Sequence, residues 1–138
     1  MEKIPEEPLE NPPEMIWREA GPGYENVSVS SEAGYLHAIV DKKQSRLFIE
    51  NFEFKPEKRG QGLGTEYLQS LAVEARNRGV KIIFGEFVSK AVIRVLIKTF
   101  GEENIFSYDL NTKNLSPVNL GEIMGKEEPF RIPLAVEL

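Results

Sequence analysis

The sequence has no cysteine and a single histidine, His37. The lack of cysteine excludes disulfides, thiolate metal sites and cysteine nucleophiles, and one histidine argues against a polyhistidine metal site. No apolar run approaches the roughly 18 residues that a membrane-spanning helix requires. The N-terminus lacks the basic and apolar segments of a secretory signal. We therefore expect a cytoplasmic protein with no bound metal and no membrane partner.

Charge is unevenly distributed along the 138 residues. Residues 1–20 hold six Glu against one Lys and one Arg, which accounts for −4 of the net charge of −5. Between residues 41 and 81, nine Lys and Arg outnumber six Asp and Glu. Nucleic-acid binders are usually basic overall, so the acidic total argues against nucleic acid as the main partner. The local excess of cations is better suited to a small anion.

The length fits one domain with a hydrophobic core of its own. Its beginning is acidic and rich in proline, and shows little periodic pattern. We expect residues 1–23 to be an extended N-terminal segment that Met15, Ile16 and Trp17 anchor to the rest of the chain. Residues 24–138 are then expected to form the folded domain.

Hydrophobic periodicity indicates the secondary structure. Alternation of apolar and polar residues predicts three strands in an antiparallel meander, and a change to a period of 3.6 residues at Leu63 predicts a helix that stops at Gly79. The next strand is strongly apolar, and its helical connection makes it parallel to the third strand. The predicted strands are 25–30, 34–40, 46–54, 80–88, 104–110 and 130–138, and a second helix lies between Ser89 and Gly101, with a short helical turn at 118–124.

These elements predict an α/β fold of the α+β type, with a mixed, mostly antiparallel sheet and helices packed on it. Ser89 is expected to be the N-cap of the second helix, because its hydroxyl can accept a hydrogen bond from a free backbone N–H. Pro133 lacks a backbone N–H and is expected to confine the last strand to an edge or a bulge.

The stretch FEFKPEKRGQGLGTEYL, residues 52–68, joins the third strand to the first helix through three alternating glycines. A glycine-rich turn before a helix N-terminus can hold phosphate, because unpaired N–H groups and the helix dipole attract an anion. A Walker loop needs a lysine after its last glycine, whereas Thr65 and Glu66 follow Gly64. The glycine spacing also differs from that of a dinucleotide fingerprint.

The remaining pattern is R-x-x-G-x-G, starting at Arg59. With its flanking elements, from about Val27 to Tyr108, this stretch resembles the pyrophosphate-binding motif of the GCN5-related N-acetyltransferase (GNAT) family. The resemblance implies a sheet whose two central parallel strands splay apart, and an enzyme that transfers an acetyl group from acetyl-coenzyme A (acetyl-CoA) to an amine acceptor.

The resemblance also implies which residues contact the acetyl-CoA. The end of the third strand would pair with the pantetheine arm, the loop amides would hold the pyrophosphate, and nearby Lys and Arg side chains would supply positive charge. Ser89 would replace an asparagine that helps to hold the coenzyme. The implied contacts are Phe52, Glu53 and Phe54 for pantetheine; Gly60, Gln61, Gly62, Leu63, Gly64 and Thr65 for pyrophosphate; and Lys55, Lys58 and Arg59 for charge.

Acyl transfer to an amine needs a base that removes the amine proton, and in the resembling family a carboxylate usually serves. Glu50 and Glu86 are the candidate general bases, and Glu53 is a weaker one. Strand alternation sends Glu50 and Glu53 to opposite faces unless a bulge resets the register. His37 lies on a neighbouring strand and is interpreted as a strand histidine with satisfied polar groups rather than as the base.

Two features depart from the family pattern. The tyrosine that usually protonates the leaving sulfur would fall at Leu96 or Ile97, which cannot donate a proton, and nothing places Ser107 or Tyr108 at the sulfur. Only a short segment precedes Tyr24, so the usual N-terminal helices are reduced. The acceptor side is then small, or is built by residues 111–129, by the tail or by a second subunit of a homodimer.

Three functions therefore remain open. An acetyltransferase with an open acceptor side suits a protein or peptide amine. A non-catalytic module that binds coenzyme A, or only a protein partner, on the same fold is the alternative that the missing tyrosine favours. A small protein that uses the glycine loop for a phosphate or nucleotide is disfavoured by the glycine spacing and the absent Walker lysine.

Overall fold

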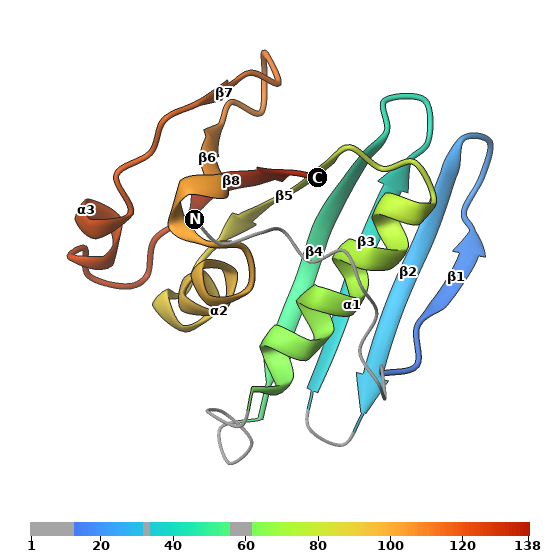
Figure 1. The fold of residues 1–138 in the computed structure, drawn as a ribbon, viewed down its shortest axis with the longest axis horizontal. Coiled ribbons are helices and arrows are strands. Elements are labelled where there is room, and N and C mark those ends of the chain that lie inside the picture. The colour runs from blue at the N-terminus through green and yellow to red at the C-terminus, as the bar shows by residue number, and fades with distance from the viewer. Residues whose placement is uncertain (1–12, 32–33, 56–61) are drawn as a thin grey trace.

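In the computed structural model, residues 13–31, 34–55 and 62–138 are described. Across these residues, eight strands form one mixed sheet in the order β1-β2-β3-β4-β5-β8-β6-β7 (Figure 1). No helix in these ranges is both long and apolar enough to span a bilayer. The elements are β1 Ile16–Glu19, β2 Tyr24–Ser31, β3 Gly34–Asp41, β4 Arg46–Phe54, α1 Leu63–Asn77, β5 Ile82–Phe87, α2 Lys90–Phe100, the 3₁₀ helix Glu102–Asn104, β6 Ile105–Tyr108, β7 Leu115–Ser116, α3 Leu120–Met124 and β8 Ile132–Glu137.

The pairing of strands confirms the predicted mixed sheet. Strands β2, β3 and β4 form the antiparallel meander, and β4 pairs with β5 in parallel. The other neighbouring strands of the described sheet are antiparallel. Helix α1 makes the parallel connection possible, because two parallel strands need a long crossover between them.

Helices α1 and α2 pack on the same face of the sheet and enclose one hydrophobic core (Figure 1). Alternate residues of the strands point into this core, as their period of two requires. Helix α1 ends where predicted, and Gly79 follows it with a left-handed φ of 87°. Buried side chains of the two helices include Leu68, Leu71, Ala72, Ala75, Ile93, Leu96 and Phe100, and those of the meander include Val27, Val29, Leu36, Ala38, Val40, Leu47 and Ile49.

The segment around Trp17 attaches to the domain as an added edge strand, β1, which was not predicted as a strand. It pairs antiparallel with β2. The Trp17 indole N–H donates a hydrogen bond of 3.0 Å to Glu74 on α1, and the Arg78 guanidinium lies 4.0 Å from the Trp17 ring centroid. These contacts confirm the expected anchor at Trp17, whereas Ile16 is exposed.

The expectation that Pro133 keeps the last strand at an edge or a bulge is wrong. Strand β8 lies between β5 and β6, inside the sheet. Pro133 is opposite Glu86 on β5, but β6 pairs only with Leu134 to Val136. The missing N–H of Pro133 therefore lies beyond the end of the β6 ladder, so an internal strand tolerates the proline.

Candidate functional site

A cleft opens where the two parallel strands separate. Strands β4 and β5 pair as far as Ile49 and Gly85, and β4 then continues to Phe54 without a partner on that side. A Cβ atom at Gly85 would lie 3.1 Å from the Ile49 carbonyl oxygen, so glycine permits the close approach at the last paired position. The cleft has a volume of about 1420 Å³, larger than the roughly 300–1,000 Å³ of ordinary small-molecule sites.

A β-bulge in β4 lies at the beginning of this separation. His37 of β3 is opposite Asn51, but Ala38 is opposite Ile49, so Glu50 is an extra residue in β4. A bulge resets the alternation of side chains along its strand. The structure therefore fulfils the condition under which Glu50 and Glu53 need not point to opposite faces.

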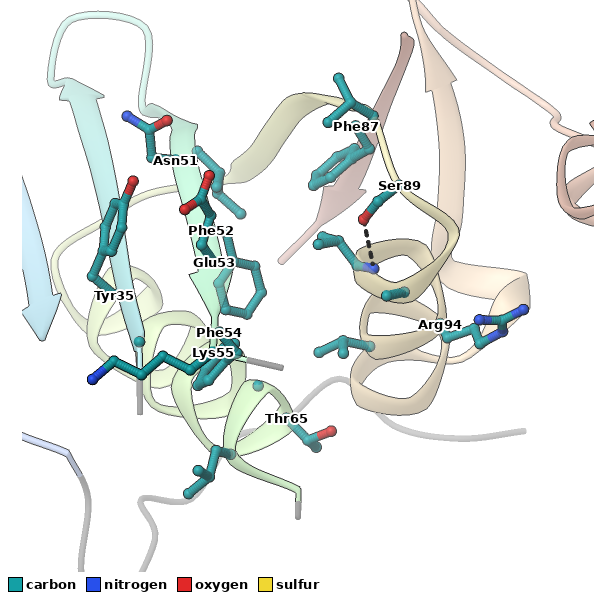
Figure 2. A pocket seen from close by; sticks show the side chains of 18 of the residues that line it. Tyr35, Asn51, Phe52, Glu53, Phe54, Lys55, Thr65, Phe87, Ser89 and Arg94 are labelled. Carbon is teal, nitrogen blue, oxygen red and sulfur yellow. Dashed lines mark hydrogen bonds between the residues drawn. The ribbon is translucent and has the colours of Figure 1, made fainter. Parts of the chain in front are cut away.

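Contacts show that both carboxylates lie on the face opposite the helices. Glu50 Oε1 is 3.8 Å from His37 Nδ1, and Glu53 is the cross-strand partner of Tyr35. Because Tyr35 and His37 are two residues apart on β3, they share a face. Figure 2 shows Tyr35, Asn51 and Glu53 on the β3 and β4 side of the cleft.

The two phenylalanines after the bulge lie on the helix side. The Phe54 ring centroid is 5.0 Å from that of Tyr67 on α1, and the Phe52 centroid is 5.4 Å from that of Phe54. Their side chains give the cleft an apolar wall, while the backbone edge of β4 beyond Ile49 has no strand partner on the side of β5 among the described residues. Such an edge can pair with an extended ligand.

Helix α1 begins at the lower end of the cleft, next to the glycine-rich turn. Gly62 is its N-cap, with φ 79°, and no side chain of the described residues caps the helix. A Cβ atom at Gly62 would have no neighbour within 4 Å among the described residues. Of the predicted site residues, Arg59, Gly60 and Gln61 lie outside the described residues, as does Lys58.

Gly64 and Thr65 occupy the first turn of α1 and line the cleft. A Cβ atom at Gly64 would lie 3.1 Å from Val95 Cγ1 on α2 and 3.5 Å from Phe52 Cζ. A larger residue would therefore force the Val95 side chain to shift by a few tenths of an ångström, so Gly64 favours the close contact between α1 and α2 beside the cleft.

Helix α2 forms the opposite wall. The Ser89 hydroxyl accepts a hydrogen bond of 3.2 Å from the Val92 N–H, which confirms the predicted N-cap. The Lys90 N–H donates to the Glu128 carboxylate. Ser89 and Arg94 belong to the lining on this side, and Figure 2 shows the Arg94 guanidinium on the side of α2 that is turned away from β4.

Basic residues line the cleft at several points, and three of them, Arg94, Lys98 and Arg131, were not predicted from the sequence. Arg94 and Lys98 of α2 line it together with Lys55 at the end of β4. For the two on α2 the signal was available, because Arg94 and Lys98 are four residues apart on a largely apolar helix and therefore share one face, together with Lys90. No group of three or more potential metal ligands occurs in the described ranges.

Comparisons with known proteins agree with this geometry. The model of the acetyltransferase (GNAT) family matches residues 4–100, which is more than half of the chain. The chain belongs to this family. No curated protein matches it.

Solved structures of acetyltransferases share the fold of this GNAT chain. A nourseothricin acetyltransferase is 19% identical, with a TM-score of 0.55 over 84% of this chain and 66% of the other. The ribosomal-protein-S18-alanine N-acetyltransferase from Escherichia coli is 17% identical, with a TM-score of 0.53 over 86% and 71%. A Bacillus subtilis acetyltransferase in complex with CoA is 14% identical, with a TM-score of 0.54 over 84% and 78%. The chain thus spans about two thirds to four fifths of these relatives.

The carboxylates of this GNAT chain have different surroundings. The Glu86 carboxylate is 3.0 Å from the Arg131 guanidinium and accepts a hydrogen bond from it. Glu50 contacts His37, and Glu53 makes no ion pair with another described residue. All three line the cleft. Of these three carboxylates, Glu50 and Glu53 therefore form no ion pair with a Lys or Arg of the described residues.

Helix α2 contains no tyrosine that could face the cleft. Leu96 is only 2% exposed and belongs to the core, and Ile97 is partly buried against it. Tyr108 lies elsewhere, since its hydroxyl accepts a hydrogen bond from Arg46 and its ring packs 4.5 Å from that of Phe84. Among the described tyrosines, Tyr35 lines the cleft, on the β3 side.

Proposed function

We propose that this GNAT-family protein is an N-acetyltransferase that transfers an acetyl group from acetyl-CoA to an amine acceptor. The observation that carries the proposal is the cleft between β4 and β5, which ends at the N-terminus of α1, where no side chain of the described residues caps the helix. An unpaired strand edge suits the amide-containing pantetheine arm, and free helix N–H groups suit a pyrophosphate. Both features lie in one continuous cleft.

The contacts proposed for acetyl-CoA follow from this arrangement. The backbone of Phe52, Glu53 and Phe54 would pair with pantetheine, and the amides of the glycine-rich turn up to Thr65 would bind the pyrophosphate, together with the predicted residues outside the described ranges. The Ser89 hydroxyl accepts from Val92 but still has its own proton to donate. The net charge of −5 would repel an anionic ligand, and the Lys and Arg residues that line the cleft would counter this repulsion locally.

For the chemical step we favour Glu50 over Glu86 as the general base. Glu86 is already engaged by Arg131, whereas Glu50 stands on the bulge where the strands begin to separate. The base removes a proton from the acceptor ammonium, the amine nitrogen bonds to the acetyl carbon, and the carbon–sulfur bond then breaks. The second proton that the nitrogen loses to become a neutral amide passes to solvent or to the departing thiolate. The thiolate can leave without a dedicated acid, which is consistent with Leu96 and Ile97 in α2.

The acceptor is proposed to be an amine on a protein or peptide. The face of the sheet that carries Glu50 and Glu53 is opposite α1 and α2. Ile39, Phe48 and Phe84 remain partly accessible between the charged groups of that face, and no helix among the described residues covers it (Figure 1). An open approach of this kind admits an extended chain more readily than it encloses a small metabolite.

Calorimetric titration with acetyl-CoA tests the proposal. We expect micromolar binding by the wild type and a loss of at least about tenfold in Gly62→Glu, because the new side chain places bulk and negative charge beside the α1 amides. Gly79→Glu is the matched control. Gly79 also has a left-handed φ and open space around it, so both variants carry a similar strain of about 1–2 kcal/mol, but Gly79 lies at the other end of α1.

Equal binding by the two variants would show that the turn does not receive the ligand. A folded wild type that binds no acetyl-CoA would refute the proposed function. The alternative, a coenzyme-binding module without turnover, is favoured by the apolar residues at the expected tyrosine position. Release of free thiol in the presence of peptide amines separates the two, because a binding module would hold acetyl-CoA without releasing thiol.

A further inference from the structure

The single histidine of the chain lies beside the bulge in β4. Its Nδ1 atom is 3.8 Å from Glu50 Oε1, and the two side chains are 31% and 43% exposed. This separation is within ion-pair range but longer than a hydrogen bond. The pairing of His37 with Asn51 places His37 next to the extra residue of the bulge.

The surroundings leave His37 as the neighbour that can orient Glu50. Across β2, the cross-strand partner of His37 is Ser28, which is neutral, and across β4 it is Asn51. The charged groups that line the cleft near Glu50 include Glu53 and Glu86, and Arg131 already engages Glu86. No Lys or Arg among the described residues forms an ion pair with Glu50.

We propose that His37 is a positioning residue that holds the Glu50 carboxylate toward the acceptor amine. This inference rests on the proposed acetyltransferase function and on Glu50 as its base. A carboxylate on a bulge is not aligned by the regular alternation of the strand, and a general base must lie within hydrogen-bonding reach of the proton that it removes. The imidazole N–H supplies the orientation that the strand does not.

A double-mutant cycle tests the proposal through steady-state kinetics with a peptide amine. The variants are His37→Val, His37→Gln, Glu50→Gln and His37→Val combined with Glu50→Gln. Valine is well suited to a strand but donates no hydrogen bond, whereas glutamine keeps an N–H donor. We expect His37→Val to lower kcat about tenfold with the KM for acetyl-CoA within about twofold, and His37→Gln to retain at least about a third of kcat.

The cycle distinguishes positioning from a merely structural role. If His37 acts through Glu50, the double variant is no slower than Glu50→Gln alone, because residues that work as a unit are not additive. Losses that multiply in the double variant would overturn the proposal, as would a His37→Gln variant no faster than His37→Val. Ser28→Ala is the control for changes to the sheet surface beside His37, and we expect its kcat to stay within about twofold of wild type.

Failure of the proposed function gives a different pattern. A protein that binds no acetyl-CoA, or binds it without turnover, removes the reaction that His37 is proposed to serve and overturns both proposals. A Glu50→Gln variant with full activity overturns the role of His37 and the assignment of the base, but leaves the acetyltransferase proposal intact. Additive losses overturn the role of His37 alone.

Discussion

The two helices that border the cleft begin in different ways. Helix α1 follows Gly62, which has a left-handed φ and gives no side-chain cap. Helix α2 follows Ser89, whose hydroxyl accepts from the Val92 N–H, and the Glu128 carboxylate accepts from the Lys90 N–H. Two donors of α2 are thus satisfied by side chains, whereas no side chain of the described residues accepts from the first N–H groups of α1.

A helix N-terminus is a candidate anion site when no side chain accepts hydrogen bonds from its first N–H groups. Both ends have the same positive partial charge from the helix dipole. At α2 this positive charge faces the Ser89 hydroxyl, just before the helix, and the Glu128 carboxylate, in the loop before β8. At α1 the N-cap is Gly62, which has no side chain that could accept from the first amides, and a Cβ atom there would meet no other described residue within 4 Å.

The largest expected effect is that acetyl-CoA stabilises the protein and protects the N-terminal amides of α1 from hydrogen exchange more than those of α2. At 100 times its dissociation constant, acetyl-CoA should raise the free energy of unfolding by about 2.7 kcal/mol. Hydrogen exchange should slow most at the amides of Leu63, Gly64 and Thr65, because they would donate to the pyrophosphate, and change less at Val92. Exchange measured by NMR with and without acetyl-CoA checks this. Stronger protection at Val92 than at Gly64 would contradict the proposed site.

A smaller effect is expected from Ser89→Ala. Loss of the N-cap should lower the free energy of unfolding by about 1 kcal/mol, and acetyl-CoA affinity should fall a few-fold because the hydroxyl proton is also lost as a donor. Chemical denaturation and calorimetry measure the two quantities. Asn119→Ala is the matched control, since Asn119 caps α3 through Glu122; it should lose stability without losing affinity. An unchanged affinity in Ser89→Ala would leave Ser89 with its capping role alone.

The smallest effect is expected from Glu128→Gln. Replacing the carboxylate near the Lys90 N–H weakens a favourable interaction with the α2 dipole, worth about 0.3–1 kcal/mol at low salt. The loss should shrink as ionic strength rises, because exposed charges are screened. Denaturation at two salt concentrations checks this, with Glu127→Gln as the control. Reduced acetyl-CoA affinity in Glu128→Gln would show that this end of α2 also serves the ligand.

Much of the fold could be predicted from local pattern. The change of period at Leu63, the glycine at position 79 and Ser89 as an N-cap depend on neighbours along the chain, and the structure confirms all three. The helical turn expected at 118–124 is confirmed as α3. The predicted parallel pairing of β5 with β4 is also confirmed, because a helix between two strands constrains their direction.

The candidate site could be predicted only in part. Gly62, Gly64 and the ends of β4 and β5 border one cleft, whereas their contacts with acetyl-CoA stay a prediction. Arg94 and Lys98 were missed because the second helix was interpreted through its apolar residues alone. The sheet face to which Glu50 points could not be predicted, because it depends on a β-bulge, and the bulge depends on how β3 pairs with β4.

The sequence by itself determined the local elements, the bare turn before α1 and the lack of a proton donor at Leu96 and Ile97. Tertiary structure decided that β8 enters the sheet between β5 and β6, that Arg131 neutralises Glu86, and that a bulge brings Glu50 to His37. The physical reason is range. Helix periods, caps and turns are set by residues a few positions apart, whereas strand order and register are set by packing between segments that are distant along the chain.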